Sequence, residues 1–419
     1  MPLSAEEQVR NCLAQAERFR EHCAFITVDA EGALCAARAL ALPADAGPLA
    51  GMILAIKDNI HVAGLPNTAG TAALRGFVPA DDAPVVARLR AAGGVIIGKT
   101  NLHELAFGIT SHNPVFGPVR NAVDPNCIAG GSSGGTAVAV ALGMAHAGLG
   151  TDTAGSIRIP AALNGIVGLR PTTGRYPHAG ITRITWSRDT AGPMARTVRD
   201  VALLDAVITG EPPVTEEAGL SGLRLGVPSA YFLDELDPAV GLRFGECLHE
   251  LRSSGVEVLE ADLREIAALD ARTGPSALYE CSVLLPAYLR DNGIDIEAAN
   301  CAAQIMSPDV RSIVQAAFAG AVDEKTHREI EEQTRPAMRQ CYAKCFRGMH
   351  IDALILPTTP LPARRLLEAP DTVEHLGTPV SAFRHYVRNT NPGSNAGLPG
   401  ISLPAGAAGG MPMGVELDA

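Results

Sequence analysis

The chain has 419 residues, of which 47% are hydrophobic and 19% charged, so it can bury a sizeable core in one large domain or in two to three smaller ones. Its net charge of −11 is spread without acidic or basic blocks, which argues against nucleic acid as a partner and favours a small-molecule ligand. No apolar run approaches the roughly 20 residues that span a bilayer, so we expect a soluble protein without a membrane partner.

The N-terminal segment, MPLSAEEQVRNCLAQAERFRE, is typical of an amphipathic surface helix that begins with acidic residues. It lacks the basic start and apolar core of a signal peptide. The nine cysteines are scattered, odd in number and without CxxC spacing. These features predict free thiols and a cytoplasmic location.

Short β-branched runs alternate with helical stretches from residue 51 onward. The runs cover 51–58, 94–99, 222–228, 256–262 and 352–357, and helices are expected over 81–92, 196–208 and 238–254. This alternation predicts an α/β fold, with a central mixed β-sheet covered by helices on both faces. No repeat or linker marks a boundary, so we expect a single domain over residues 1–419.

Residues 264–347 have a more helical pattern, which predicts a helix-rich insertion or cap. Within it, Pro336 is expected to kink or split a long helix. The chain closes on MPMGVELDA, which we expect to form a last strand without a closing helix. That expectation leaves open whether further residues would cover a functional site.

Lys57 lies in MILAIKDNI, at the end of an apolar strand. To become neutral at pH 7 its pKa must fall by about 3, which corresponds to about 4 to 5 kcal/mol of burial cost. A neutral lysine can serve as the base for a serine nucleophile. The alternative is a structural lysine paired with Asp58. Lys99, in VIIGKTN, has the same setting and is the rival base.

The segment IAGGSSGGTAVAVALG, residues 128–143, places Ser132 and Ser133 between two glycine pairs. A helix over 135–145 and a strand over 147–152 would return the chain to the same end of the sheet, so these serines would approach Ser156. Glycines let backbone come close to a ligand, and a helix start favours developing negative charge. The candidate oxyanion donors are the backbone N–H groups of Thr153, Ala154, Gly155 and Ser156.

The sequence of this loop allows other roles. GGSSGG is also the composition of a flexible linker. A phosphate loop would need a GK[ST] ending, which is missing here. Gly131 to Gly135 matches G-x-S-x-G with Ser133 as nucleophile, but the preceding RNAVDPNCIAG is not a strand. The histidines, including His103 and His112, stand in no evident triad or metal setting, so we expect neither metal nor cofactor.

The motifs AIKDNI, GGSSGGTAVAVA and GLGTDTAGSIRIPAALNGIVGLRPT together resemble the amidase signature family of serine amide hydrolases. The resemblance runs from about residue 50 to the end, with its core at about 50–210. It implies the family fold and a Ser-cisSer-Lys triad: Ser156 as nucleophile, Ser132 as proton relay after a cis peptide, and Lys57 as neutral base. It also implies supporting roles for Ser133, Asp152 and Arg158, which would bind one another. The family usually has glycine where this chain has Ala154, whose methyl group is expected to require negative φ or to narrow the acyl site.

Two further stretches, FGITSHNPVFGPVRN and ITRITWSRDTAGPMARTVRD, most resemble the indoleacetamide and mandelamide hydrolases of that family. This implies cleavage of a small aryl-substituted carboxamide to an acid and ammonia through a Ser156 acyl-enzyme. Phe107, Phe116 and Trp186 are candidate pocket aromatics, with plain core packing as the alternative. The alternatives kept open are a glutaminase-type subunit of an amidotransferase, a hydrolase of urea- or carbamate-like C–N bonds, and a non-catalytic amide-binding member. The sequence does not fix the oligomeric state, and a homodimer is one possibility.

Overall fold

One eleven-stranded sheet runs through the computed structural model, which describes residues 3–40, 47–214, 219–367 and 371–419. Its strand order is β1-β3-β2-β6-β8-β7-β14-β15-β11-β9-β10. In chain order these strands are β1 (Phe25–Val28), β2 (Ile53–Lys57), β3 (Val95–Thr100), β6 (Ala147–Asp152), β7 (Val167–Arg170), β8 (Thr190–Ala195), β9 (Arg224–Pro228), β10 (Glu257–Ala261), β11 (Ala353–Pro357), β14 (Gly400–Ala408) and β15 (Met411–Asp418). Two small ladders join β4 (His112–Asn113) to β5 (Gly117–Pro118) and β12 (Thr372–His375) to β13 (Thr378–Ser381).

The sheet is mixed, as the sequence predicts. Strand β2 pairs in parallel with β3 and β6, and β9 pairs in parallel with β10 and β11. Between these parallel groups, the ladder from β6 through β8, β7, β14 and β15 to β11 is antiparallel. The C-terminal residues form β15, so the expected last strand is confirmed.

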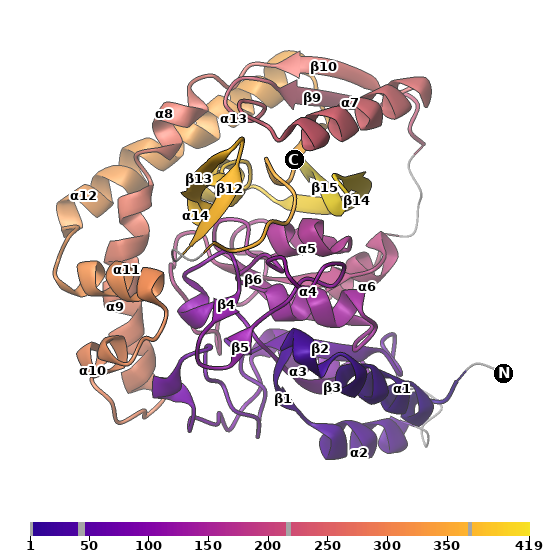
Figure 1. The fold of residues 1–419 in the computed structure, drawn as a ribbon, viewed down its shortest axis with the longest axis vertical. Coiled ribbons are helices and arrows are strands. Elements are labelled where there is room, and N and C mark those ends of the chain that lie inside the picture. The colour runs from indigo at the N-terminus through magenta and orange to yellow at the C-terminus, as the bar shows by residue number, and fades with distance from the viewer. Residues whose placement is uncertain (1–2, 41–46, 215–218, 368–370) are drawn as a thin grey trace.

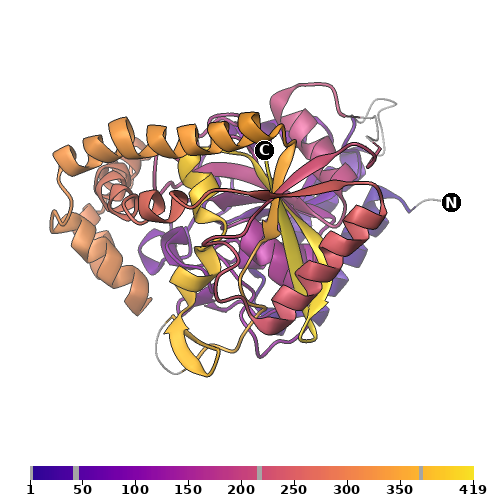
Figure 2. The same cartoon turned by 90° about the horizontal axis from the view of Figure 1, so that it is seen from above.

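Helices cover both faces of this sheet (Figures 1 and 2). They are α1 (Ala5–Arg18), α2 (Ala30–Leu40), α3 (Pro84–Ala91), α4 (Gly134–Ala141), α5 (Arg158–Asn164), α6 (Val198–Thr209), α7 (Pro238–Ser253), α8 (Ile266–Asp270), α9 (Gly274–Asp291), α10 (Ala298–Ala303), α11 (Pro308–Phe318), α12 (Glu324–Glu329), α13 (Arg335–Met349), α14 (Ala382–Val387) and α15 (Asn391–Ala396). Helix α1 begins as the sequence suggests, because Ser4 and Glu7 form a capping box. Within the described ranges, no helix is both long and apolar enough to cross a membrane.

The alternation of side chains along β2 explains why this strand is apolar throughout. Leu54 and Ile56 belong to the core cluster that packs against α3 and α6, whereas Ile53 and Ala55 belong to the cluster that packs against α1, α2 and α4. Successive side chains of a strand point to opposite faces of the sheet. Lys57 therefore continues the row of Ile53 and Ala55, which directs its ammonium group toward the start of α4.

Helices α8 to α13 lie together along one side of the molecule, where Figure 1 shows them as an arc beside the sheet. This is the helix-rich region expected at 264–347. The expected interruption near Pro336 is confirmed: α12 passes into a π-helical turn at Ile330–Thr334, and Pro336 stands in the first turn of α13. Helix α4 ends at Ala141 rather than at 145, because Gly143 adopts a φ of 70° that a helix cannot continue.

Candidate active site

The glycine-serine loop is a buried, tightly packed turn, so its interpretation as a flexible linker is wrong. All residues from Gly130 to Gly135 are buried, and the peptide bond between Gly131 and Ser132 is cis. A Cβ atom placed on Gly135 would lie 2.3 Å from the carbonyl oxygen of Asn101. The glycines are needed because neighbouring backbone occupies the space where side chains would stand.

Lys57 contacts the first serine of this loop directly. Its Nζ lies 2.7 Å from Ser132 Oγ and 2.7 Å from Thr151 Oγ1. The Thr151 hydroxyl also accepts a hydrogen bond from Asn59 Nδ2, at 3.1 Å. A neutral amine can accept the proton of the Ser132 hydroxyl through its lone pair while it donates to Thr151. Thr151 thus joins the site as a residue that the sequence analysis missed.

Burial weakens the charged form of Lys57. Its side chain is fully buried, and this burial lowers the pKa of Lys57 to about 7, against the opposing attraction of Asp152 and Asp189. A large part of the Lys57 population is therefore neutral near pH 7. A proton can then move from Ser132 to the amine without a strongly unfavourable equilibrium.

Lys99, the rival base, has a different environment. Its Nζ pairs with Asp58 Oδ1 at 3.0 Å and donates to Pro66 O at 2.9 Å and to Asn67 Oδ1 at 3.2 Å. These partners form a closed, buried cluster without a serine. The pairing with Asp58 that was considered for Lys57 therefore belongs to Lys99 instead.

Ser156 lies at the wall of a cavity, next to the buried loop. The side chain is 6% exposed and lines a cavity of about 260 Å³. The backbone N–H of Ser133 donates to Ser156 O at 3.1 Å, which joins the two serine loops. Among the residues that the structure describes, no hydrogen bond links the hydroxyls of Ser132 and Ser156. Lys57 and Ser132 are therefore in direct contact, whereas the loop of Ser132 is joined to Ser156 through the backbone.

The Asp152 carboxylate shapes the turn that carries Ser156. It accepts hydrogen bonds from Gly155 N at 2.8 Å and from Ile157 N at 3.2 Å. Gly155 adopts a φ of 123°, which favours glycine, and a Cβ there would lie 2.2 Å from Thr390 Oγ1. The turn is therefore fixed by one carboxylate below it and by a glycine that no larger residue can replace.

This arrangement changes the expected set of oxyanion donors. The N–H of Gly155 is engaged by Asp152, so it does not point to the cavity as the sequence analysis expected. The backbone N–H groups of Thr153, Ala154 and Ser156 have no hydrogen-bond partner in the described chain. Ala154 is not among the residues with positive φ, so its methyl group requires no strained backbone, and it lines the cavity beside Ser156.

A buried ion network supports Asp152 from below. Its carboxylate accepts hydrogen bonds from Arg158 Nε and Nη2, both at 3.1 Å, and from Arg170 Nη1 at 3.3 Å. Burial alone would raise the Asp152 pKa, but the two guanidinium groups hold this pKa well below its usual range. Arg158 also pairs with Glu416, from the last strand. Arg170 and Glu416 are further residues that the sequence analysis missed.

Ser133 supports the loop differently from the expected contact with Asp152 and Arg158. Its Oγ donates to Thr151 O at 3.1 Å and accepts from Thr151 N at 3.3 Å, so it ties the loop to β6. The hydroxyl is fully buried. The preceding residues form a coil, apart from an isolated bridge at Arg120 and Ile128. A nucleophile elbow centred on Ser133 therefore has neither the strand nor the exposure that it needs.

We expect Asp152→Asn to destabilise the fold by about 3 to 5 kcal/mol, because it removes the carboxylate that the buried guanidinium groups of Arg158 and Arg170 share. The Asp152 pKa is lowered in the folded state, so its stabilising effect is present above its ordinary value of about 3.9 and is lost as pH falls below it. Urea unfolding at pH 7 and at about pH 2.5 measures both effects, because most of the stabilisation is still present at pH 4.

The matched control for this change is Asp262→Asn, because Asp262 forms an exposed pair with Arg264. This control should barely move the urea midpoint, since solvent screens the exposed pair. Equal midpoints for wild-type protein and Asp152→Asn would contradict the supporting role of the buried network.

The cavity next to Ser156 is mainly apolar. Besides the nucleophile turn, its wall consists of residues from the 106–109 loop, α9, α11, α14 and their surroundings: Ala106, Phe107, Gly108, Ile109, Ile184, Arg188, Gly274, Ala277, Leu278, Ile313, Phe383, Val387 and Asn391. Of the three candidate aromatics, Phe107 lines this cavity. Phe116 instead lies under the guanidinium of Arg75, and Trp186 packs edge-on against Tyr279 and His327.

Comparison with known proteins gives one consistent result. A protein-family model described as Amidase matches residues 7–419. The chain is 41% identical to a mandelamide hydrolase of Pseudomonas putida, covering 99% of this chain and 85% of that protein, and 40% identical to an indoleacetamide hydrolase of Agrobacterium vitis, covering 99% and 90%. Among solved structures it resembles an amidase with a TM-score of 0.88 at 36% identity, covering 100% of this chain and 92% of that one. It also resembles the native peptide amidase of Stenotrophomonas maltophilia, with a TM-score of 0.84 at 29% identity, covering 100% and 90%.

Proposed function

The chain belongs to the amidase family and is an amidohydrolase that cleaves amide C–N bonds, and from this premise we propose that it acts through an acyl-enzyme on Ser156. The observation that carries the proposal is the 2.7 Å contact between the buried amine of Lys57 and the hydroxyl of Ser132, beside the cavity that Ser156 lines. Lys57 would serve as the base and Ser132 as the proton relay, and the cavity beside Ser156 has room for the amide substrate.

The proposed reaction begins when Ser156 Oγ bonds to the amide carbonyl carbon. Its proton passes to the oxygen of Ser132, whose own proton moves to the neutral amine of Lys57. The negative charge on the former carbonyl oxygen is stabilised by the free N–H groups of Thr153, Ala154 and Ser156. The C–N bond then breaks as the relay returns a proton to the departing nitrogen. Ammonia leaves, and water attacks the ester by the same relay to release the acid.

The proposed substrate is a small aryl-substituted primary carboxamide. A cavity of about 150 Å³ with apolar walls suffices for benzene, so about 260 Å³ holds an aryl ring with a short substituent. Phe107, Leu278 and Ile313 give the wall an apolar character. The relatives named after mandelamide and indoleacetamide support the same class of substrate.

The proposal is tested by mapping the adduct of a serine-directed fluorophosphonate on the folded chain. We expect one adduct, on Ser156, and none on the chain unfolded in urea, because unfolding separates the serine from Lys57. An adduct on Ser133 would contradict the assigned nucleophile. Absence of both adduct and ammonia release would favour a member that only binds amides.

The substrate class is tested by ammonia release from indole-3-acetamide, phenylacetamide, butyramide, glutamine and phenylurea. Burial of an aryl group in the cavity should raise kcat/KM by about 10- to 100-fold over butyramide. A preference for glutamine would instead favour the glutaminase subunit of an amidotransferase. A preference for phenylurea would favour a hydrolase of urea-like C–N bonds.

We further propose that the chain acts without a different partner chain and in a reducing compartment such as the cytoplasm. All nine cysteines are free thiols, including the neighbouring Cys341 and Cys345 on α13, which supports a reducing location. Gel filtration with an assay of each fraction distinguishes an active monomer or homodimer from a chain that is active only in a larger complex.

A further inference from the structure

A buried arginine stands in the wall of the Ser156 cavity, and no carboxylate of the described chain forms an ion pair with it. Arg188 is 6% exposed and lines the cavity, whose other side chains are mainly apolar. Its Nη1 donates to Asn395 Oδ1 at 2.8 Å and to Asn391 Oδ1 at 3.1 Å. Within the described ranges, Nε is buried without a partner and Nη2 makes no hydrogen bond. The guanidinium therefore keeps unused donors beside the cavity.

The two asparagines hold the guanidinium in place. Their amide nitrogens donate to Asp270: Asn391 Nδ2 at 2.9 and 3.1 Å, and Asn395 Nδ2 at 2.9 Å. Each amide thus bridges a cation and an anion, with its oxygen toward Arg188 and its nitrogen toward Asp270. Asn391 is thus engaged at both ends, whereas Arg188 still has donors to offer, besides the hydroxyls of Thr153 and Ser156 in the turn.

The loop before Arg188 is clamped to the helical cap. Glu280 of α9 accepts hydrogen bonds from Trp186 N at 2.6 Å and from Ser187 N at 2.9 Å. The carbonyl oxygen of Arg188 accepts from Arg170 Nη2 at 2.8 Å. The backbone on both sides of the Arg188 side chain is therefore fixed, and a donor that is fixed before binding loses little entropy when a substrate arrives.

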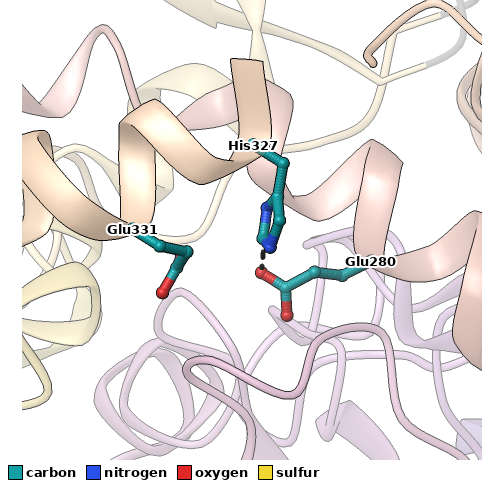
Figure 3. A group of neighbouring side chains, drawn as sticks. All are labelled: Glu280, His327 and Glu331. Atoms are coloured by element: carbon teal, nitrogen blue, oxygen red, sulfur yellow. Dashed lines mark ion pairs between the residues drawn. The ribbon is translucent and has the colours of Figure 1, made fainter. Parts of the chain in front are cut away.

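Figure 3 shows Glu280 with its neighbours His327 and Glu331, three groups whose ligand atoms lie within 4.8 Å of one another. Their spacing would suit a cation, but both oxygens of Glu280 already accept hydrogen bonds from Ser187 and its neighbours, and Glu331 pairs with Arg335 at 2.5 Å. We therefore interpret this cluster as the clamp that positions the loop of Arg188, and not as a metal centre.

The surrounding charges indicate what Arg188 can bind. Burial and the nearby Arg335 lower the pKa of Arg188 to about 10, so it is a cation at neutral pH and only donates. Glu280, Asp189 and Asp270 already attract it. Because Arg188 and Arg335 already face these three acids, a substrate carboxylate would add a further buried negative charge, whereas an uncharged oxygen adds none.

We propose that Arg188 is a specificity-determining residue, which donates a hydrogen bond to an uncharged oxygen on the acyl part of the substrate. The proposal rests on the amidase function proposed above and narrows its substrate class to aryl amides that carry a hydroxyl or carbonyl group. An amide without that oxygen leaves the buried donors unpaired, so the site discriminates against it.

The test compares amides that differ by one group of similar size. One pair is 2-hydroxy-2-phenylacetamide against 2-phenylpropanamide, and the other is 4-hydroxyphenylacetamide against 4-methylphenylacetamide. In wild-type protein we expect kcat/KM to favour the hydroxyl member of at least one pair by about 10- to 100-fold. Arg188→Met should reduce that ratio to about 1, because the hydroxyl member loses its donor and the methyl member no longer leaves buried donors unpaired.

Two controls keep the outcomes distinct. Arg188→Lys retains the charge but not the forked donors, and we expect an intermediate ratio, which decides the question if the methionine variant does not fold. Phenylmalonic acid monoamide, with a carboxylate in place of the hydroxyl, should react more slowly than the hydroxyl amide. Ratios near 1 in both wild-type pairs, or an Arg188-dependent preference for the carboxylate, would overturn the inference. Loss of turnover on every amide by wild-type protein would instead refute the proposed function.

Discussion

Replacing Ser156 by alanine is expected to lower kcat for amide hydrolysis by about five to six powers of ten, which is the scale seen when a serine nucleophile is removed. The variant lacks the oxygen that forms the ester, and nothing else in the cavity wall supplies an activated hydroxyl. Thr153 carries the other hydroxyl of the turn, but the backbone hydrogen bond that joins this turn to the serine loop is made at Ser156 and not at Thr153. The rate of ammonia release is measured for the variant and for wild-type protein at the same concentration, and the ratio of the two rates gives the loss in kcat. A sample with a known trace of wild-type protein shows how much residual activity contamination could cause.

Ser133→Ala is the matched control, because it removes a hydroxyl of the same kind from the same buried loop. Within the described residues, the Ser133 hydroxyl bonds only to backbone groups of Thr151, so its loss should cost about tenfold in kcat and leave the fluorophosphonate adduct on Ser156. If Ser133→Ala were as inactive as Ser156→Ala and also lost its label, the assignment of the nucleophile would have to move to Ser133.

The pattern of predicted strands placed most of the candidate site residues before the structure was known. Lys57 interrupts an apolar strand, and the return of the chain through 147–152 predicts that Ser132 and Ser156 meet at one sheet edge. The fold class also follows from alternating runs, because strands buried on both faces are apolar throughout, as β2 is. Helix ends were less well predicted, since Gly143 ends α4 by a local φ that composition does not reveal.

The missed residues share one physical feature: their role depends on a partner far away in the chain. Thr151 is an ordinary strand residue until the parallel register of β2 and β6 brings its hydroxyl to Lys57, 94 positions away. Arg188 matters because Asn391 and Asn395, about 200 positions later, orient it. For Trp186 the sequence left a pocket and plain packing open, because a sparse aromatic residue suits both, and the structure packs it against Tyr279 and His327.

The oxyanion turn illustrates the same limit at shorter range. Four consecutive N–H groups are equivalent in the sequence, but only the conformation decides which face the cavity. Asp152 takes the N–H of Gly155, and this contact depends on the buried guanidinium groups of Arg158 and Arg170. The electrostatic network therefore fixes which N–H groups of this turn have no partner in the described chain, and these are the oxyanion donors that we propose.

Replacing Lys57 by methionine is expected to lower kcat/KM by about three to four powers of ten at pH 7, the upper range for a general base. In wild-type protein, kcat/KM should fall about tenfold per pH unit below the Lys57 pKa of about 7, because protonation removes the base, and should level off above it. The variant should lose this inflection. A pH profile from 5 to 9 measures both the loss and the change in shape.

Urea unfolding is the control that distinguishes a variant that has lost its base from a variant that no longer folds. The folded pKa of Lys57 lies below its unfolded value of about 10.4, so the unfolded chain binds the extra proton and wild-type stability falls as pH decreases from about 10 to 7. Lys57→Met is free of this burial cost and should unfold at a higher urea concentration at pH 7.

The paired change Asp58→Asn with Lys99→Met removes the other buried lysine together with its charge partner. This pair should keep the inflection near pH 7; if it abolished the inflection while Lys57→Met retained it, the base would be Lys99.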